Sequence, residues 1–339
     1  MKNKLVSRLM GCLALAVLAP VAVPAAAAER PAASAAKRLT LKEIREHFAD
    51  GQSKYLDVGG VNIHYKDEGS GPPILLVHGS MSSLKTWDGT ASYLVANGYR
   101  VIRYDLPGFG LSDGASDEAV KALEPTDLPE ALLAKLGIGK ITVVGVSSGG
   151  TLGVQLAAKR PDLVTRLVIS NAPSDPLSWS PPRDPSSYPQ AFTAAQAEHK
   201  RLGYRSRAFW DAWFDYYAGV PSRYGKAFKD DVYTMMLREE DKNILHLIAK
   251  VENHEFARGA MNAVKAPTLL LWGGADPLLP VAAMNKLESY LTGATVSKMV
   301  MMDVGHYPPL EIPTRYGELV KTYIEKVQPD LTSEQKSAE

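Results

Sequence analysis

The fold of this chain is decided by the stretch Ile141-Thr142-Val143-Val144-Gly145-Val146-Ser147-Ser148-Gly149. Its first four residues form a short apolar run that suits a strand covered on both faces, and Thr151–Lys159 has a helical pattern. The turn between strand and helix must be sharp, and only the small residues at 145 and 149 allow the close approach. Such a turn lifts the Ser147 hydroxyl above the sheet and leaves the N–H of Ser148 as a free donor at the helix start.

A Gly-x-Ser-x-Gly sequence on its own is weak evidence, because a chain of this composition contains one by chance about once in seven cases. A glycine-rich helix entry or a phosphate-cradling loop is the alternative interpretation. The lysine that follows in a phosphate loop is missing here, and the sequence has no Gly-x-Gly-x-x-Gly. The pattern on either side of Ser147 therefore decides its interpretation.

Short apolar runs bounded by Gly and Pro recur along the chain and alternate with helical patterns. This alternation predicts an α/β fold with a mostly parallel sheet, preceded by a hairpin at Gly59-Gly60. The predicted strands are 55–58, 61–65, 74–77, 101–104, 141–144, 167–170, 268–272 and 296–301, and the predicted helices are 39–48, 87–96, 128–136, 151–159 and 313–327.

The alternation stops after the strand at 167–170. Residues 173–185 are dense in Pro, Ser and Asp, and residues 190–260 have helical patterns, no strand signal and five of the seven Phe residues. A helical insertion between two strands of a sheet is best interpreted as a cap. The predicted organisation is a signal peptide at 1–28, a linker and short helix at 29–51, an α/β core in two parts at 52–172 and 263–328, a helical cap at 173–262, and a polar tail at 329–339.

A serine hydroxyl is a poor nucleophile unless a base takes its proton, so one of the seven histidines should lie near Ser147. His306 stands just past the predicted strand at 296–301, where an exposed loop would end above the sheet. Gly305 permits a tight approach there. The other histidines lie before the sheet, in the hairpin, in the loop at 78–80 or in the inserted segment. We therefore expect His306 to be the base.

The base needs a carboxylate that holds its tautomer and stabilises the imidazolium. Asp276 stands just past a predicted strand, so Ser147, Asp276 and His306 occur in the chain order of a strand-end triad. Asp175, which also follows a strand, is the second choice for the acid. Asp303 is the third, because its closeness to His306 in the chain favours a capping or structural role.

The loop His78-Gly79-Ser80 follows another predicted strand. We expect the N–H of Ser80 to supply a second oxyanion donor beside that of Ser148, and His78 to be structural. Loss of one such donor typically costs about 2.7–4 kcal/mol of transition-state stabilisation. The predicted triad and this loop all fall at the carboxyl ends of strands, where an open α/β sheet places its site.

Composition excludes several classes of function. Lys plus Arg number 38 and Asp plus Glu 37, a formal charge of +1, so the chain has no basic excess for a nucleic-acid backbone. An apolar fraction of 45% with 22% charged residues is typical of a globular protein and not of a disordered one. The single cysteine, Cys12, excludes an internal disulfide and a cysteine-based metal cluster, and we expect no bound metal.

The first 28 residues have the layout of a secretory signal peptide. Three basic residues precede an apolar run at 9–23, and the alanines at 26–28 form a cleavage site. An uncleaved membrane anchor is the alternative, but two prolines interrupt the run, which is short of the roughly 20 strongly apolar residues of a span. We expect export to the periplasm or the medium and no stable membrane span afterwards. Removal of 1–28 takes away three basic residues and Cys12, so the formal charge changes from +1 to −2.

The chain resembles the α/β-hydrolase superfamily in further stretches. Tyr104-Asp105-Leu106-Pro107-Gly108-Phe109-Gly110-Leu111-Ser112 is similar to the superfamily's Asp-x-x-Gly-x-Gly-x-Ser turn. His78-Gly79 with Trp87 is similar to its oxyanion loop and the following helix. The resemblance covers about residues 52–327, with the inserted segment as the variable cap. It implies a mixed, mainly parallel sheet of about eight strands and no cofactor.

Departures from related groups narrow the predicted activity. Haloalkane dehalogenases and epoxide hydrolases carry Asp at the nucleophile position, where this chain has Ser147. Proline iminopeptidases have His-Gly-Gly-Pro-Gly in place of His78–Ser82, and ring-cleavage C–C hydrolases usually have Asn in place of Val146. The resemblance therefore implies a carboxylic-ester hydrolase, or a lactonase, acting on a small ester-like substrate.

Two alternatives stay open: a C–C or amide hydrolase with the same triad, and a non-catalytic binding protein that kept the fold. The aromatic residues of the cap favour an apolar or aromatic substrate. Aromatic residues at helical spacing also commonly pack a cap onto its sheet, so the sequence does not decide which of them line a pocket.

Overall fold

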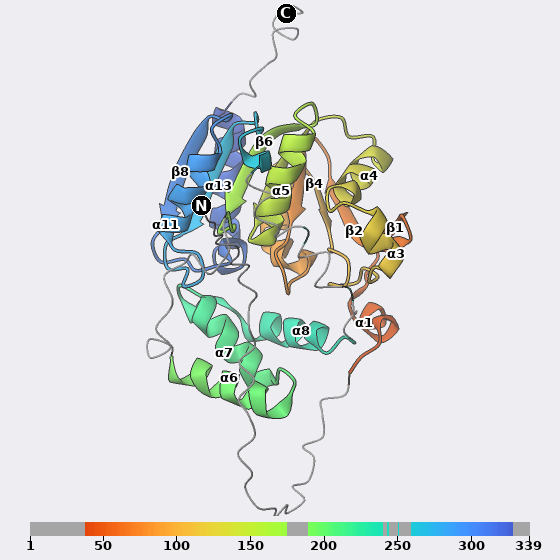
Figure 1. Cartoon of the computed structure of the whole chain (residues 1–339), viewed down its shortest axis with the longest axis vertical. Helices are drawn as coiled ribbons and strands as arrows, with labels where there is room; N and C mark the ends of the chain where they lie inside the picture. The colour runs from red at the N-terminus through yellow and green to blue at the C-terminus, as the bar shows by residue number, and fades with distance from the viewer. Residues whose placement is uncertain (1–37, 175–188, 240–242, 244–249, 251–258, 328–339) are drawn as a thin grey trace, which may run out of the picture. The chain divides into compact units, whose positions relative to one another are not determined.

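A single eight-stranded sheet organises the chain (Figure 1). The computed structural model describes residues 38–174, 189–239, 243, 250 and 259–327. The strand order is β1-β2-β4-β3-β5-β6-β7-β8; the β1–β2 and β2–β4 pairs are antiparallel and the other pairs are parallel. The predicted α/β fold with a mostly parallel sheet is confirmed. The strands are β1 (Lys54–Val58), β2 (Val61–Gly69), β3 (Pro73–Val77), β4 (Arg100–Tyr104), β5 (Ile141–Val146), β6 (Val164–Ser170), β7 (Thr268–Gly273) and β8 (Val296–Met301).

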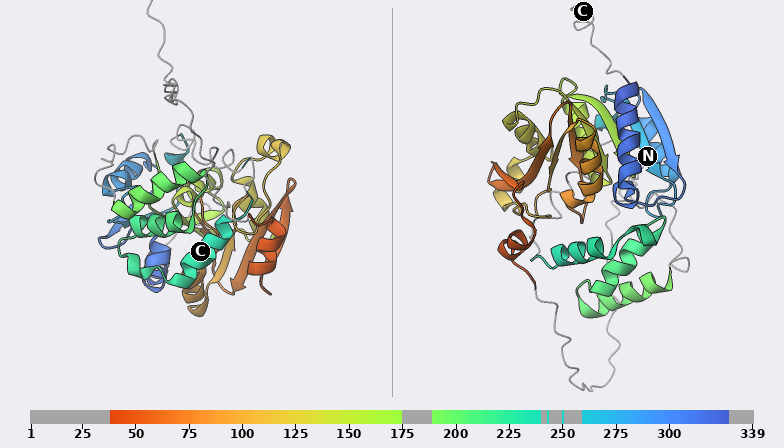
Figure 2. Two further views of the ribbon diagram at one scale, coloured as in Figure 1. Left: turned by 90° about the horizontal axis from the view of Figure 1, so that it is seen from below. Right: turned by 180° about the vertical axis from the view of Figure 1, so that it is seen from behind.

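Alternate residues of the central strands pack on opposite faces of the sheet. In β3, Leu75 and Val77 belong to one buried apolar cluster, whereas Ile74 and Leu76 belong to another. Seen from behind, α13 (Pro313–Lys326) lies across the second face (Figure 2). The first face is covered by α3 (Asp117–Ala122), α4 (Asp127–Lys135), α5 (Ser148–Lys159) and α11 (Val281–Tyr290), and the second by α2 (Asp88–Ala96) and α13 (Pro313–Lys326).

Some helices differ from the predicted ones. The helix expected at 87–96 begins as a 3-10 turn, η1 (Leu84–Trp87), and continues as α2. Helices α3 and α11 were not predicted. The six residues of α3 are too few to show a helical period, and α11 buries only Met284 and Leu287 completely, so both give a weak amphipathic signal. Helix α1 (Leu41–Phe48) begins at a capping box between Thr40 and Glu43.

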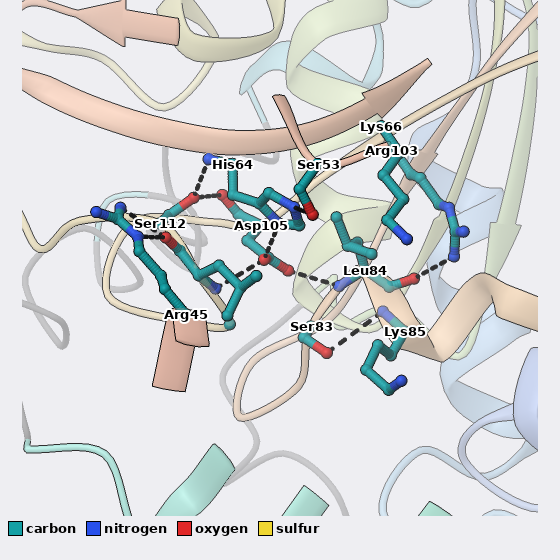
Figure 3. A network of polar contacts seen from close by, with 12 residues as sticks. Arg45, Ser53, His64, Lys66, Ser83, Leu84, Lys85, Arg103, Asp105 and Ser112 are labelled. Carbon is teal, nitrogen blue, oxygen red and sulfur yellow. Dashed lines mark hydrogen bonds and ion pairs between the residues drawn. The ribbon is translucent and has the colours of Figure 1, made fainter. Parts of the chain in front are cut away.

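The turn after β4 is built around the buried carboxylate of Asp105 (Figure 3). The N–H groups of Leu84 and Leu111 donate to it at 2.7 and 2.8 Å, and His64 Nδ1 lies 2.8 Å from its Oδ2. A Cβ on Gly110, which has a φ of 50°, would collide with this carboxylate. The motif at 104–112 therefore joins β2, β4 and the start of η1 through one buried acid.

Three helices of the segment between β6 and β7 form a cap: α6 (Gln190–Leu202), α7 (Arg207–Tyr217) and α8 (Lys226–Met236), with the 3-10 turn η4 (Pro221–Arg223) before α8. Figure 1 shows them side by side in green and teal. They share a buried aromatic cluster of their own, so much of the aromatic pattern in the sequence stabilises the cap itself. The aromatic residues buried in it are Phe192, Phe209, Trp210, Phe214 and Tyr224.

Candidate active site

Ser147 lies in the sharp turn between β5 and α5, with a φ of 55° and a ψ of −132°. This backbone conformation is strained for a residue other than glycine, and the surrounding packing holds it. A Cβ on Gly145 would collide with the carbonyl oxygen of Gly149, and a Cβ on Gly149 would collide with that of Val77. The two glycines are therefore required by the close approach of α5 to β5 and β3.

The Ser147 side chain is half-buried, whereas Val146 and Ser148 are buried. Its backbone N–H donates to the carbonyl oxygen of Ser170 at 3.0 Å, which joins the turn to the end of β6. Gly79 packs against the Ser147 side chain, since a Cβ at Gly79 would come within 2.8 Å of Ser147 Cβ. The serine therefore faces the loop at 78–80.

Asp276 and His306 are in direct contact. His306 Nδ1 lies 2.7 Å from Asp276 Oδ2, and the two residues are only 2% and 4% exposed respectively. Asp276 follows β7 and His306 follows β8, which are parallel neighbours, so their loops meet at one edge of the sheet. The N–H of Leu278 donates to the other carboxylate oxygen at 2.6 Å. A carboxylate held in this way favours the Nδ1–H tautomer of His306 and leaves Nε2 as an acceptor.

The loops that carry the predicted groups are bonded to one another. The hydroxyl of Tyr307, next to His306, donates to the carbonyl oxygen of Ser80 at 3.2 Å. The N–H of Ser80 donates to Oγ of Ser148, next to Ser147, at 2.8 Å, and the two hydroxyl oxygens are also 2.8 Å apart. The Ser80 N–H, predicted as an oxyanion donor, thus has the Ser148 hydroxyl as its partner in this structure.

Asn171 supports the acid and was not predicted from the sequence. It is buried directly after β6, with a φ of 44°. Its Nδ2 donates to Asp276 Oδ2 at 2.8 Å and to the carbonyl oxygen of Gly273 at 3.2 Å, and its Oδ1 accepts the Gly273 N–H at 2.9 Å. A polar residue directly after a predicted strand, at the edge that carries the site, is the signal that could have identified it.

The alternative acids are placed differently. Asp175 lies outside the described residues. Arg223 of η4 donates from Nη1 to the carbonyl oxygen of Asp303 at 2.7 Å, and its guanidinium also pairs with the Asp303 carboxylate. The hydrogen bond from Arg223 to the Asp303 carboxylate lowers the pKa of Asp303 below its ordinary value. The Asp303 side chain is 67% exposed, so its carboxylate faces Arg223 and solvent.

His78 fastens the loop that precedes η1. Its Nε2 accepts the N–H of Leu106 at 2.9 Å, and its Nδ1 lies 2.7 Å from the carbonyl oxygen of Gly79. These partners require a neutral ring with its proton on Nδ1. Burial lowers the pKa of His78, in agreement with a ring that stays neutral.

A second set of Ser, His and Asp side chains is joined by hydrogen bonds, from Ser53 to His64 and from His64 to Asp105 (Figure 3). His64 Nε2 is 2.9 Å from Ser53 Oγ, which also accepts the Asp50 N–H at 3.1 Å. A cavity of about 450 Å³ lies beside His64, and Ser147 is not among its lining residues. We interpret this set as structural, because the Asp105 carboxylate also accepts the N–H groups of Leu84 and Leu111 and so holds the turn after β4 in place. Charged side chains beside the cavity form ion pairs: Lys66 with Asp50, Arg103 with Glu68 and Asp88, and Lys85 with Asp88 and Asp231.

The described part of the chain offers neither a metal centre nor a membrane-spanning helix. Among those residues, no three His, Cys, Asp or Glu side chains are grouped in a way that could hold a metal ion. Within the same ranges, no helix is long and apolar enough to cross a membrane.

Comparison with known proteins places the chain among hydrolases of several chemistries. The family model for the alpha/beta hydrolase fold matches residues 72–313. Epoxide hydrolase 3 of Xenopus tropicalis is 26% identical over 297 residues, which cover 82% of this chain and 79% of the relative. Lipase 1 of Psychrobacter immobilis is 29% identical over 257 residues, which cover 74% of this chain and 77% of the relative. The structure of a meta-cleavage product hydrolase from Pseudomonas fluorescens IP01 is similar with a TM-score of 0.62 at 21% identity, covering 80% of this chain and 97% of that one.

Proposed function

Since the chain belongs to the α/β-hydrolase family, we propose that it is a serine hydrolase that cleaves a carboxylic ester or lactone through an acyl-enzyme on Ser147. The observation that carries the proposal is the 2.7 Å contact between His306 Nδ1 and Asp276 Oδ2, at the edge of the sheet where Ser147 stands in its strained turn. An epoxide hydrolase is among the relatives, but the serine at 147 favours acyl transfer over epoxide opening.

In the proposed reaction, His306 Nε2 takes the hydroxyl proton of Ser147 as Oγ attacks the carbonyl carbon of the ester. The imidazolium then donates this proton to the leaving oxygen, the alcohol departs, and the acyl group stays on Ser147. Water gives a proton to Nε2 as its oxygen attacks the acyl carbon. Collapse of the second tetrahedral intermediate releases the acid and returns the proton to Ser147. Asp276 stays ionised throughout and stabilises the imidazolium.

The oxyanion of both intermediates is assigned to the N–H groups of Ser148, at the start of α5, and Ser80. The Ser148 hydroxyl accepts the Ser80 N–H at 2.8 Å, which keeps this donor oriented before substrate arrives. An oxyanion competes with this hydroxyl for the N–H. The hydrogen bond from the Ser80 N–H to the Ser148 hydroxyl joins two neutral groups, so its loss costs only about 1 kcal/mol. A hydrogen bond from the same N–H to a charged oxyanion is stronger than this.

An apolar or aromatic substrate is favoured by aromatic rings that the cap places near His306. The ring of Tyr217 in α7 is 5.8 Å from that of His306, and Trp213 is 4.5 Å from Tyr217. Both cap residues are half-buried, whereas Phe209, Trp210 and Phe214 are buried within the cap's own cluster, against which Trp213 also packs. We therefore assign the substrate-facing role to Trp213 and Tyr217 and a packing role to the buried cap aromatics.

A C–C or amide hydrolase with the same three residues is the alternative function. The similarity to a meta-cleavage product hydrolase motivates it, although that similarity concerns the fold. A panel that compares p-nitrophenyl esters, p-nitroanilides and a vinylogous 1,5-diketone separates these activities by the bond that is cleaved. A non-catalytic binding protein with this fold is the remoter alternative, and it predicts no turnover of any member of the panel.

The decisive experiment compares Ser147→Ala with Ser53→Ala, because Ser53 also contacts a His–Asp pair. Wild type should hydrolyse p-nitrophenyl acetate and butyrate and should be labelled by a fluorophosphonate probe. Ser147→Ala should lose labelling and about 10⁶-fold in kcat, whereas Ser53→Ala should keep both. An unlabelled wild type, or labelling that survives in Ser147→Ala, would refute the nucleophile.

We also propose that residues 1–28 are a cleaved signal peptide and that the mature enzyme is exported. The three-part pattern of the sequence supports this, and these residues lie outside the described part of the structure. Intact mass measurement of enzyme from the periplasm and the medium should give a chain that begins at Glu29. A chain found only in the cytoplasm with residues 1–28 attached would contradict the proposal.

A further inference from the structure

Glu311, the last residue of α12 (Pro308–Glu311), carries a carboxylate that is completely buried. Its Oε1 accepts the N–H of Gly305 at 2.6 Å. The same carboxylate accepts the N–H of Gly219 at 3.0–3.1 Å and that of Val220 at 3.2 Å. One acid thus holds three backbone donors from two segments that are far apart in the chain.

The two segments belong to the cap and to the loop of the proposed base. Gly219 and Val220 follow α7 of the cap, whereas Gly305 directly precedes His306. A Cβ on Gly219 would collide with the carbonyl oxygen of Asp303, and a Cβ on Gly305 would collide with that of Tyr217. The cap and the His306 loop are therefore in backbone contact, and Glu311 lies at that contact.

The buried carboxylate of Glu311 is stabilised by backbone N–H groups and by a nearby positive charge. Burial raises the pKa of Glu311, while hydrogen bonds from Gly219, Gly305 and Val220 oppose this shift. Arg223 adds a positive charge, with Nη1 3.7 Å from Glu311 Oε2. Buried carboxylates are costly unless such donors satisfy them, so loss of the acid would leave three backbone N–H groups without their acceptor.

We propose that Glu311 is a positioning residue that clamps the His306 loop to the cap and thereby sets the place of the His306 ring relative to Ser147. The inference rests on the proposed function, because it takes His306 as the base. The alternative is a buried acid that only adds stability to the fold. The two differ in what removal of the charge does to the rate of a correctly folded enzyme.

Glu311→Gln is the first variant, because it keeps the shape of the side chain but replaces one acceptor oxygen by a donor. We expect kcat for p-nitrophenyl butyrate and the rate of fluorophosphonate labelling to fall about 10²-fold, with KM changed by less than about threefold, since displacement of a catalytic group by 1 Å costs this much. Glu318→Gln on α13 is the matched control, because Glu318 is 41% exposed and pairs with Arg315. It should match wild type in both rates.

A double-mutant cycle then separates positioning from stability. In the Asp276→Asn background, Glu311→Gln should cost less than about tenfold, because both changes act through the same ring. Circular dichroism must first show that each variant is folded at the assay temperature. If Glu311→Gln does not fold, Glu311→Asp takes its place. Its carboxylate is one methylene too short to reach both segments, so the same loss of kcat is expected.

Each outcome decides one of the two claims. A wild type that the probe does not label refutes the proposed function itself. A labelled wild type together with a folded Glu311 variant of normal kcat overturns only the positioning role. The positioning role is also overturned if Glu311→Gln lowers kcat by the same factor in the Asp276→Asn background as in wild type, since such a loss would not act through His306.

Discussion

The backbone N–H of His306 donates to the carbonyl oxygen of Tyr217 at 2.9 Å. Tyr217 is the last residue of α7, so the loop of the proposed base is bonded directly to the cap. Their rings are 5.8 Å apart. The cap therefore contacts the His306 loop in two ways: its aromatic rings lie near the His306 ring, and its backbone is hydrogen-bonded to the loop that carries His306.

Gly219→Ala should separate the cap from this loop. The new Cβ would collide with the carbonyl oxygen of Asp303, so one of the two segments must move. Displacement of the His306 loop by about 1 Å should lower kcat about 10²-fold. Gly225→Ala is the control, because nothing lies within 4 Å of a Cβ there and its φ is −63°. Kinetics with p-nitrophenyl butyrate on both variants test this, and equal kcat values would contradict it.

Asp276→Asn should lower kcat by about 10⁴-fold, because an amide in place of the carboxylate no longer selects the Nδ1–H tautomer of His306. Asp303→Asn is its counterpart at the other aspartate near the base. The Asp303→Asn variant loses only an exposed ion pair with Arg223, so its unfolding temperature should stay close to that of wild type. Steady-state kinetics and thermal unfolding of both variants distinguish the two acids. Normal turnover in Asp276→Asn would shift the assignment to Asp175.

Gly149→Ala should destabilise the turn that presents Ser147. Its Cβ would collide with the carbonyl oxygens of Val77 and His78, which are backbone atoms and cannot rotate away. Overpacking of this kind costs about 1–3 kcal/mol in the free energy of unfolding. Gly139→Ala should change it by less than about 0.5 kcal/mol, since its Cβ would meet nothing within 4 Å. Urea unfolding of both variants provides the comparison, and similar midpoints would show that the close approach is not required.

The stability of the fold should fall as the pH drops below about 6.5, the ordinary pKa of histidine. Burial lowers the pKa of His78 in the folded state, so below this pH the unfolded chain binds a proton that the folded chain does not. One such group reduces the free energy of unfolding by up to about 1.4 kcal/mol for each pH unit. Urea unfolding between pH 7.5 and about 5 measures this slope.

The slope should become shallower in His78→Gln, whatever that substitution does to the stability at neutral pH. Gln does not titrate, and its side-chain oxygen can still accept a backbone N–H such as that of Leu106. An unchanged slope would assign the acid sensitivity to other groups.

Much of the fold is encoded in local patterns. The short apolar runs at 74–77 and 141–144 identify central strands because such strands are buried on both faces. Helix α3 gave only a weak signal because six residues show too little of a helical period. The cap aromatics were ambiguous for a different reason: helical spacing is the same for Phe214, which is buried in the cap, and for Tyr217, which lies near His306.

By itself, the sequence determined the strand, sharp turn and helix around Ser147 and the order in which a serine, an acid and a histidine follow strands. These features depend on neighbours within a few residues, since a tight turn needs glycine and a buried strand needs apolar side chains. Only the tertiary structure decided that Asp276 contacts His306 and that Asn171, 105 residues before Asp276, donates to it. It also decided that Glu311 joins the His306 loop to the cap. Those contacts arise where separate loops meet at one edge of the sheet, and no local pattern records which loops will meet.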